Sequence, residues 1–394
     1  MKIIIAIFGL VAGIAVGYYL VTYSLTSPHT KNGVIDANNN SKSFNRSEKQ
    51  VVGFLPYWFI NKEGEDFAKY ITTLTYFGLT INSDGTIQKF TKPTQTEPGW
   101  HTLNSGKVNK FLDVAGRANL TTSLLVFKSN NDAIDALLSD PVAHAQNLVN
   151  EAVPIMKQYG FTDLNLDIES TKEGSTDAQM RFTQFAKTLK RGLSNVGTLT
   201  VEMSASDFVK NKLIDPKSIK DIADYVIIMA YDYHFPGSIV TGPVAPLSGG
   251  GVTYEYDTEI AVKEALKIIP KGKIILGIPL YGYEWETIGD TNHSAVVPGT
   301  SIVASNERAE NLLSTCQTCT TIYEEDAQEV LLTFKDAKTG TNHQIFYPNE
   351  RSTQAKINYT NVNKLGGLAL WALGYEGKSI LSPLSNYLTA GLRN

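Results

Sequence analysis

The sequence contains little cysteine, little histidine and no excess of basic charge. Its 394 residues include two cysteines and six histidines, and 35 basic residues against 39 acidic ones give a formal net charge of -4. Nucleic-acid-binding domains usually carry a strongly basic surface, so nothing in the composition indicates a nucleic-acid partner. The lack of a second cysteine pair argues against a zinc site built from cysteines. The hydrophobic share of 42% and the charged share of 19% are typical of a globular protein.

The two cysteines form a C-x-x-C motif, Cys316 to Cys319. This motif is compatible with a local disulfide, a pair of free thiols or a redox site. The surrounding residues, NLLSTCQTCTTIYEE, are not typical of a strand that leads into a helix beginning at a cysteine. We favour a short structural disulfide in an exported protein, with free thiols as the second interpretation and redox catalysis as the third.

The N-terminus carries an uncharged run over residues 3–23. The run is about as long as a bilayer is thick, and no small-x-small cleavage site follows it. We therefore predict a transmembrane signal anchor over residues 1–24 and a disordered polar linker over residues 25–50. Lysine placement predicts a cytoplasmic N-terminus. The rest of the chain would then be membrane-anchored and extracytoplasmic, with secretion after signal cleavage as the alternative.

From residue 51 onward, strand-like segments alternate with helical ones. The strand-like segments are 51–58, 74–82, 121–127, 161–170, 198–205, 224–234, 273–285 and 366–376. Helices are expected over 176–193, 257–269 and 352–364. Eight strands with intervening helices are typical of a (β/α)8 TIM barrel of the α/β class, which we predict for residues 51–394. The stretch after the seventh strand is too long for a structureless loop, so we predict a small α+β insertion domain over residues 286–345.

The fourth strand segment has an unusually polar face. Asn165, Asp167 and Glu169 alternate with apolar residues, and a side-chain period of two places all three on one face. In a barrel, the C-terminal ends of the strands carry the chemistry, so Glu169 would lie at the mouth. Repulsion between neighbouring carboxylates predicts that one keeps its proton near neutral pH, which suits Glu169 to general acid catalysis. Asn165 would donate a hydrogen bond to Asp167 and orient it.

The polar face of this segment is compatible with two other structures. An ordinary amphipathic strand would turn the same three residues to solvent. A magnesium or calcium site would use the same oxygen ligands. The neighbouring strand ends offer no further acidic cluster or histidine pair, so we predict no metal.

Aromatic and polar residues also mark the ends of other predicted strands. Met229, Tyr231 and Asp232 end the sixth strand, Tyr281 lies on the seventh and Trp371 on the eighth. Each of them alone would be compatible with a role in the core. Their common position at the predicted mouth favours a shared site.

Several segments together resemble glycoside hydrolase family 18, the chitinase-like barrels. The family strand reads D-G-x-D-x-D-x-E, and residues 162–169 keep the last Asp and the Glu but have Asn165 at the innermost acidic position. The Asn version resembles the branch of spore-cortex-lytic N-acetylglucosaminidases. The MAYD, GIPLYGYEW and LGGLALWALGYE segments, and the predicted insertion, are similar to the same family. The resemblance covers residues 51 to the C-terminus.

The resemblance implies hydrolysis of β-1,4-linked N-acetylglucosamine glycans, of the peptidoglycan or chitin type, by substrate-assisted retaining catalysis. By position, it implies that Glu169 is the acid and base, Asp167 holds the acetamide N–H, and Tyr231 bonds the acetamide oxygen. Asn165 completes the catalytic group. The implied substrate-binding residues are Met229, Asp232, Trp371, Phe54 and Tyr281. No cofactor is implied, and we expect a monomer. A carbohydrate-binding protein without turnover, a lectin, is the alternative.

Overall fold

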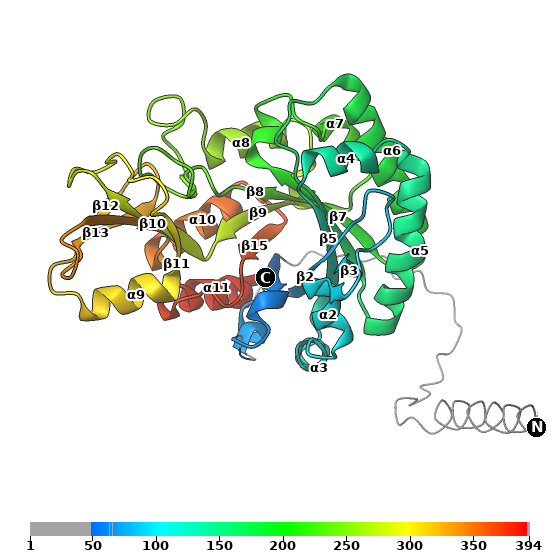
Figure 1. Ribbon diagram of the computed structural model, residues 1–394, viewed down its shortest axis with the longest axis horizontal. Helices are drawn as coiled ribbons and strands as arrows, with labels where there is room; N and C mark the ends of the chain where they lie inside the picture. The colour runs from blue at the N-terminus through cyan, green and yellow to red at the C-terminus, as the bar shows by residue number, and fades with distance from the viewer. Residues whose placement is uncertain (1–48, 63, 65, 392–394) are drawn as a thin grey trace, which may run out of the picture. The chain divides into compact units, whose positions relative to one another are not determined.

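A closed barrel of parallel strands forms the body of the molecule (Figure 1). The computed structural model describes residues 49–391, except residues 63 and 65. Around the barrel the order is β1-β15-β9-β8-β7-β6-β5-β2. The strands are β1 (Gln50–Pro56), β2 (Thr73–Thr80), β5 (Thr121–Lys128), β6 (Asp163–Ile168), β7 (Thr198–Ser204), β8 (Tyr225–Met229), β9 (Ile274–Pro279) and β15 (Gly367–Trp371). The predicted TIM barrel is therefore confirmed.

Helices cover the outside of the barrel. They are α2 (Pro98–Asn104), α3 (Asn109–Arg117), α4 (Asn131–Leu137), α5 (Pro141–Tyr159), α6 (Thr176–Gly192), α7 (Pro216–Ile219), α8 (Thr258–Leu266), α10 (Glu350–Val362) and α11 (Lys378–Gly391). Short 3-10 helices lie at Tyr57–Phe59, Asp66–Lys69, Ala205–Phe208 and Lys271–Lys273, and β3 (Phe90–Lys92) pairs with β4 (Gln95–Thr96). Local signals explain the helix starts, because Ser175 caps α6 and Asp257 caps α8 through side-chain oxygens that accept backbone N–H groups.

The two faces of β6 have different surroundings. All six of its residues are buried, although the sequence alternates between polar and apolar side chains. Leu164 and Leu166 belong to the main core together with Phe182 and Phe185 of α6. The apolar face thus packs outward against the helices, and the polar face points into the barrel, as the alternation requires.

A second sheet forms the insertion after β9. Its order is β11-β10-β14-β13-β12. The elements are β10 (Tyr281–Thr287), β11 (Ile302–Ser305), α9 (Asn306–Thr315), β12 (Thr320–Glu324), β13 (Glu329–Lys335) and β14 (Asn342–Tyr347). The sheet extends beyond the expected 286–345 on both sides.

The single strand expected over residues 273–285 is wrong, because the structure divides it into β9 and β10. The division falls at Leu280, whose N–H donates to the carbonyl of Trp371 at 2.7 Å and whose carbonyl accepts from Asn306. The barrel hydrogen bonding thus ends at Leu280, and the chain continues into the second sheet. The residues on either side of Leu280 are buried and largely apolar, so their sequence gives no sign of the boundary.

The transmembrane part of the fold prediction needs correction. None of the helices within residues 49–391 is both long enough and apolar enough to cross a membrane. The expected anchor, residues 1–24, and most of the expected linker lie outside the described residues. The predicted local disulfide is confirmed, since Cys316 and Cys319 form a disulfide at the end of α9.

Candidate active site

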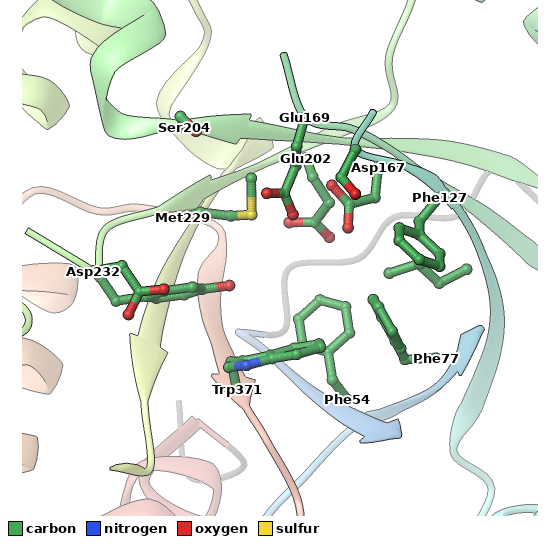
Figure 2. Close-up of a pocket in the computed structure, with 13 residues that line it drawn as sticks. Phe54, Phe77, Phe127, Asp167, Glu169, Glu202, Ser204, Met229, Asp232 and Trp371 are labelled. Atoms are coloured by element: carbon green, nitrogen blue, oxygen red, sulfur yellow. The ribbon is translucent and has the colours of Figure 1, made fainter. Parts of the chain in front are cut away.

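A cavity of about 310 Å³ opens at the C-terminal ends of the barrel strands (Figure 2). The residues that line it come from strands on every side of the barrel. They are Phe54, Phe77, Leu125, Phe127, Ser129, Asp167, Glu169, Glu202, Ser204, Met229, Tyr231, Asp232 and Trp371. Strand β6 and the residue after it contribute carboxyl groups on one side of the cavity, and Trp371 lies opposite them.

The polar face of β6 begins deep in the barrel with Asp163. Its carboxyl group accepts hydrogen bonds from Ser123 at 2.6 Å, Thr198 at 2.5 Å and Thr200 at 3.0 Å. Burial raises the pKa of Asp163, while these three hydroxyl groups act in the opposite direction. A carboxyl group with this many partners is suited to joining β5, β6 and β7 rather than to contacting a ligand.

Asn165 lies one step nearer the mouth and is buried. Its Nδ2 donates to Oε1 of Glu202 on β7 at 2.7 Å. The predicted hydrogen bond to Asp167 is therefore wrong, because the amide is directed across to the neighbouring strand. Asn165 contacts the lining residue Glu202 but does not itself line the cavity.

Asp167 and Glu169 form a hydrogen-bonded carboxyl pair. Burial raises the pKa of Asp167 well above its ordinary value, and the charge of Glu169 raises it further. Although Glu169 is solvent-exposed at the mouth, crowding of its carboxyl group by protein atoms raises its pKa. The charge of Asp232 adds to that increase, whereas the hydrogen bond from Asp167 lowers it. The pair can therefore hold one shared proton near neutral pH.

Asp232 is fixed by two tyrosines of β10. Its Oδ1 accepts hydrogen bonds from the hydroxyl groups of Tyr281 and, at 2.9 Å, Tyr283. Its backbone has a φ of 60°, a conformation that is uncommon for a residue other than glycine and that clusters at functional sites. Tyr231 beside it has a pKa raised by burial and by the surrounding carboxyl groups, which leaves its hydroxyl a neutral donor.

Aromatic rings form the wall opposite the carboxyl groups. Trp371 contacts Phe77 and Phe54, with ring centroids 4.8 and 5.6 Å apart. Trp58 extends this wall outward, because its ring is 6.4 Å from Trp371 and the residue is 45% exposed. Flat apolar surfaces of this kind suit the apolar face of a ring-shaped ligand.

Seven of the nine predicted site residues line the cavity, and Asn165 and Tyr281 lie behind it. Sequence reasoning missed the other lining residues, of which Glu202 is the only carboxyl group. Its signal was present, because Thr200, Glu202 and Ser204 alternate with apolar residues as the β6 residues do. Within residues 49–391, no group of three or more His, Cys, Asp or Glu side chains is arranged to hold a metal ion.

The geometry suits proton transfer at Glu169 to and from a ligand between the carboxyl groups and the aromatic wall. Asp167 and Tyr231 offer an acceptor and a donor for a polar substituent deeper in the cavity.

Comparisons with known proteins point to one family. The model of "Glycosyl hydrolases family 18" matches residues 50–376. The cortical fragment-lytic enzyme of Bacillus subtilis (strain 168) is 26% identical over 284 residues, which are 69% of this chain and 61% of the relative. The chain therefore spans less than two thirds of that relative's length.

Two solved structures share the fold. The spore cortex-lytic enzyme SleL of Bacillus cereus aligns with a TM-score of 0.67 and 19% identity, over 86% of this chain and 74% of that one. A chitinase of Cycas revoluta in complex with (GlcNAc)4 aligns with a TM-score of 0.70 and 20% identity, over 87% and 99%.

Proposed function

Because the chain belongs to family 18 of the glycosyl hydrolases, we propose that it hydrolyses β-1,4-linked N-acetylglucosamine glycans with retention of configuration. The observation that carries the proposal is the Asp167–Glu169 carboxyl pair, which lines the cavity opposite the aromatic wall. A non-catalytic binding protein would have no need of a carboxyl group with a raised pKa at the cavity mouth.

The geometry favours a mechanism in which the substrate supplies its own nucleophile. A retaining enzyme with a carboxylate nucleophile places its two carboxyl groups about 5–5.5 Å apart, across the sugar. Asp167 is instead hydrogen-bonded to Glu169, and Asp232 is engaged by Tyr281 and Tyr283. These contacts support attack on the anomeric carbon by the acetamide oxygen of the bound N-acetylglucosamine.

The reaction proceeds in two steps. As the glycan binds, the shared proton moves from Asp167 to Glu169, and Asp167 accepts the acetamide N–H. Glu169 then protonates the glycosidic oxygen while the acetamide oxygen closes an oxazolinium ring and the leaving sugar departs. In the second step, the Glu169 carboxylate removes a proton from water, and the water oxygen attacks the anomeric carbon from the face that the leaving sugar occupied. The bond between the anomeric carbon and the acetamide oxygen breaks, which reopens the ring and restores the acetamide. Tyr231 donates to the acetamide oxygen and Trp371 packs beneath the sugar.

The names of the relatives guide the choice of substrate. The first relatives are cortical fragment-lytic enzymes, and others are chitinases. We propose peptidoglycan as the first substrate to test and chitin oligosaccharides as the second. The Cys316–Cys319 disulfide supports an extracytoplasmic location, because disulfides persist in oxidising compartments.

Product analysis tests the function. The protein is incubated with purified peptidoglycan and with chitin oligosaccharides, and released fragments are identified by mass spectrometry. The proposal predicts new reducing ends at N-acetylglucosamine residues, formed initially as the β anomer. Saturable oligosaccharide binding without any product after prolonged incubation would instead support a lectin.

A further inference from the structure

Glu202 is a buried carboxyl group in the cavity wall that the mechanism above does not use. Only 2% of the residue is exposed, yet it lines the cavity beside Asp167. One of its oxygens, Oε1, accepts the hydrogen bond from Asn165. The other, Oε2, has no hydrogen-bond partner among the described residues. A buried polar atom without a partner is costly, by about 1–3 kcal/mol, so each one requires an explanation.

A matching unpaired oxygen lies on Asp167. This residue is 4% exposed, and its Oδ1 also has no partner within the described part of the chain. Figure 2 shows the carboxyl groups of Asp167, Glu169 and Glu202 directed toward the same part of the cavity. Two carboxyl oxygens can form a hydrogen bond only when one of them carries a proton, because ionised carboxylates are acceptors only.

The groups that face Glu202 indicate which state it adopts. Asp163, Asp167 and Glu169 face it from β6 and the residue that follows, and Tyr231 faces it from the end of β8. None of these four groups is cationic. Burial raises the pKa of Glu202 well above its ordinary value, and the charge of Asp167 raises it further, while the hydrogen bond from Asn165 acts in the opposite direction. Glu202 therefore holds its proton more tightly than an exposed glutamate does.

We propose that Glu202 is a positioning residue, which donates a hydrogen bond from Oε2 to Oδ1 of Asp167 and thereby holds Asp167 as the acceptor of the substrate N–H. The inference rests on the proposed function, since it assigns the support of that same site. Asn165 acts through Glu202, because its amide occupies Oε1 and leaves Oε2 as the oxygen that can donate. The innermost acid of the family pattern is absent from β6, and β7 supplies a carboxyl group in its place.

Three variants of the full chain test this role in turnover. Glu202→Gln keeps an N–H donor but cannot ionise, so kcat should stay within about threefold of wild type and the basic limb of its pH profile should not move. Glu202→Leu removes the donor, so kcat should fall by about 10- to 100-fold with a smaller change in KM. Adding Asn165→Asp to Glu202→Leu returns a carboxyl group to β6 and should restore about tenfold of the lost kcat.

Wild-type kcat in Glu202→Leu would overturn the inference. The inference would also be overturned if the basic limb of the kcat–pH profile moved to lower pH in Glu202→Gln. That shift requires that Glu202 is ionised in wild type and that its charge raises the pKa of Glu169. A structural role alone would not produce rescue by Asn165→Asp.

Unfolding measurements separate this inference from the proposed function. A carboxyl group whose pKa is higher in the folded than in the unfolded state reduces stability as pH rises from about 4.3, its unfolded value, through the folded pKa. The free energy of unfolding of Glu202→Gln should therefore exceed that of wild type by an amount that grows with pH. Parallel curves would overturn the inference, whereas absent turnover in wild type would overturn only the proposed function.

Discussion

Asp232 adjusts the proton affinity of Glu169 by charge. The two tyrosines that donate to Asp232 favour its ionised form, and its charge is the second largest cause of the raised pKa of Glu169, after desolvation. Glu169 must be protonated to act as the acid, so its pKa sets the basic limb of kcat against pH.

Replacing Asp232 by Asn should move that basic limb to lower pH. The substitution removes the negative charge, which lowers the pKa of Glu169, and Asn tolerates the φ of 60° at this position. The measurement is kcat from pH 4 to 9 on the glycan that wild type cleaves. Tyr283→Phe is the matched control, because it removes one hydrogen bond and leaves the charge. An unchanged limb in Asp232→Asn would contradict the electrostatic link.

At the scale of single residues, alternation within one strand was sufficient to predict that Asp167 and Glu169 share a face. It could not predict the partner of Asn165. That partner, Glu202, is on β7, and Asn165 is level with Thr200 in the pairing of the two strands. The contact depends on this pairing and on side-chain length, neither of which a single strand's pattern contains.

At the scale of elements, the buried carboxyl group of Glu329 joins the insertion sheet both to α10 and to the loop that carries Asp232. Glu329 of β13 accepts hydrogen bonds from the backbone N–H groups of Val244 and Ala245 at 2.8 and 2.7 Å. Lys356 of α10 lies 3.6 Å from the same carboxyl group, and both side chains are at most 1% exposed. The carbonyl of Val244 in turn accepts from the N–H of Tyr233, the residue after Asp232.

Replacing Glu329 by Ala should destabilise the protein by about 3–5 kcal/mol, because it leaves the buried Lys356 charge without a partner. Urea unfolding measures the change. Adding Lys356→Met should recover part of the loss, since the uncompensated charge is then removed, but the two backbone N–H groups stay unpaired. Equal stabilities of wild type and Glu329→Ala would show that this pair does not hold the elements together.

Element boundaries were predictable where a local signal marks them. Ser175 and Asp257 cap the starts of α6 and α8, which lie close to the predicted starts at residues 176 and 257. The sixth strand, expected over residues 224–234, ends at Met229 instead. The residues that follow directly, Ala230 and Tyr231, are of the apolar and aromatic types common in strands. Nothing in the sequence marks the left-handed backbone of Asp232.

At the scale of the whole molecule, residues 49–391 belong to one compact unit that contains the barrel, the insertion and the cavity. A fragment of these residues should therefore fold by itself. We expect its midpoint of thermal unfolding to lie within about 2 °C of that of the full chain, which corresponds to a difference of about 1.5 kcal/mol for a domain of this size. Differential scanning calorimetry of the two proteins provides the comparison, and a fall of many degrees would contradict it.

The central claim is that Glu169 moves the proton in glycan hydrolysis. Its most direct test compares wild type with Glu169→Gln, which keeps size and hydrogen bonding but cannot transfer the proton. We predict that kcat for release of reducing ends falls by about 10²- to 10⁴-fold. Oligosaccharide affinity, measured by calorimetry, should remain within about threefold because the aromatic wall is intact. A Glu169→Gln variant as active as wild type would contradict the account.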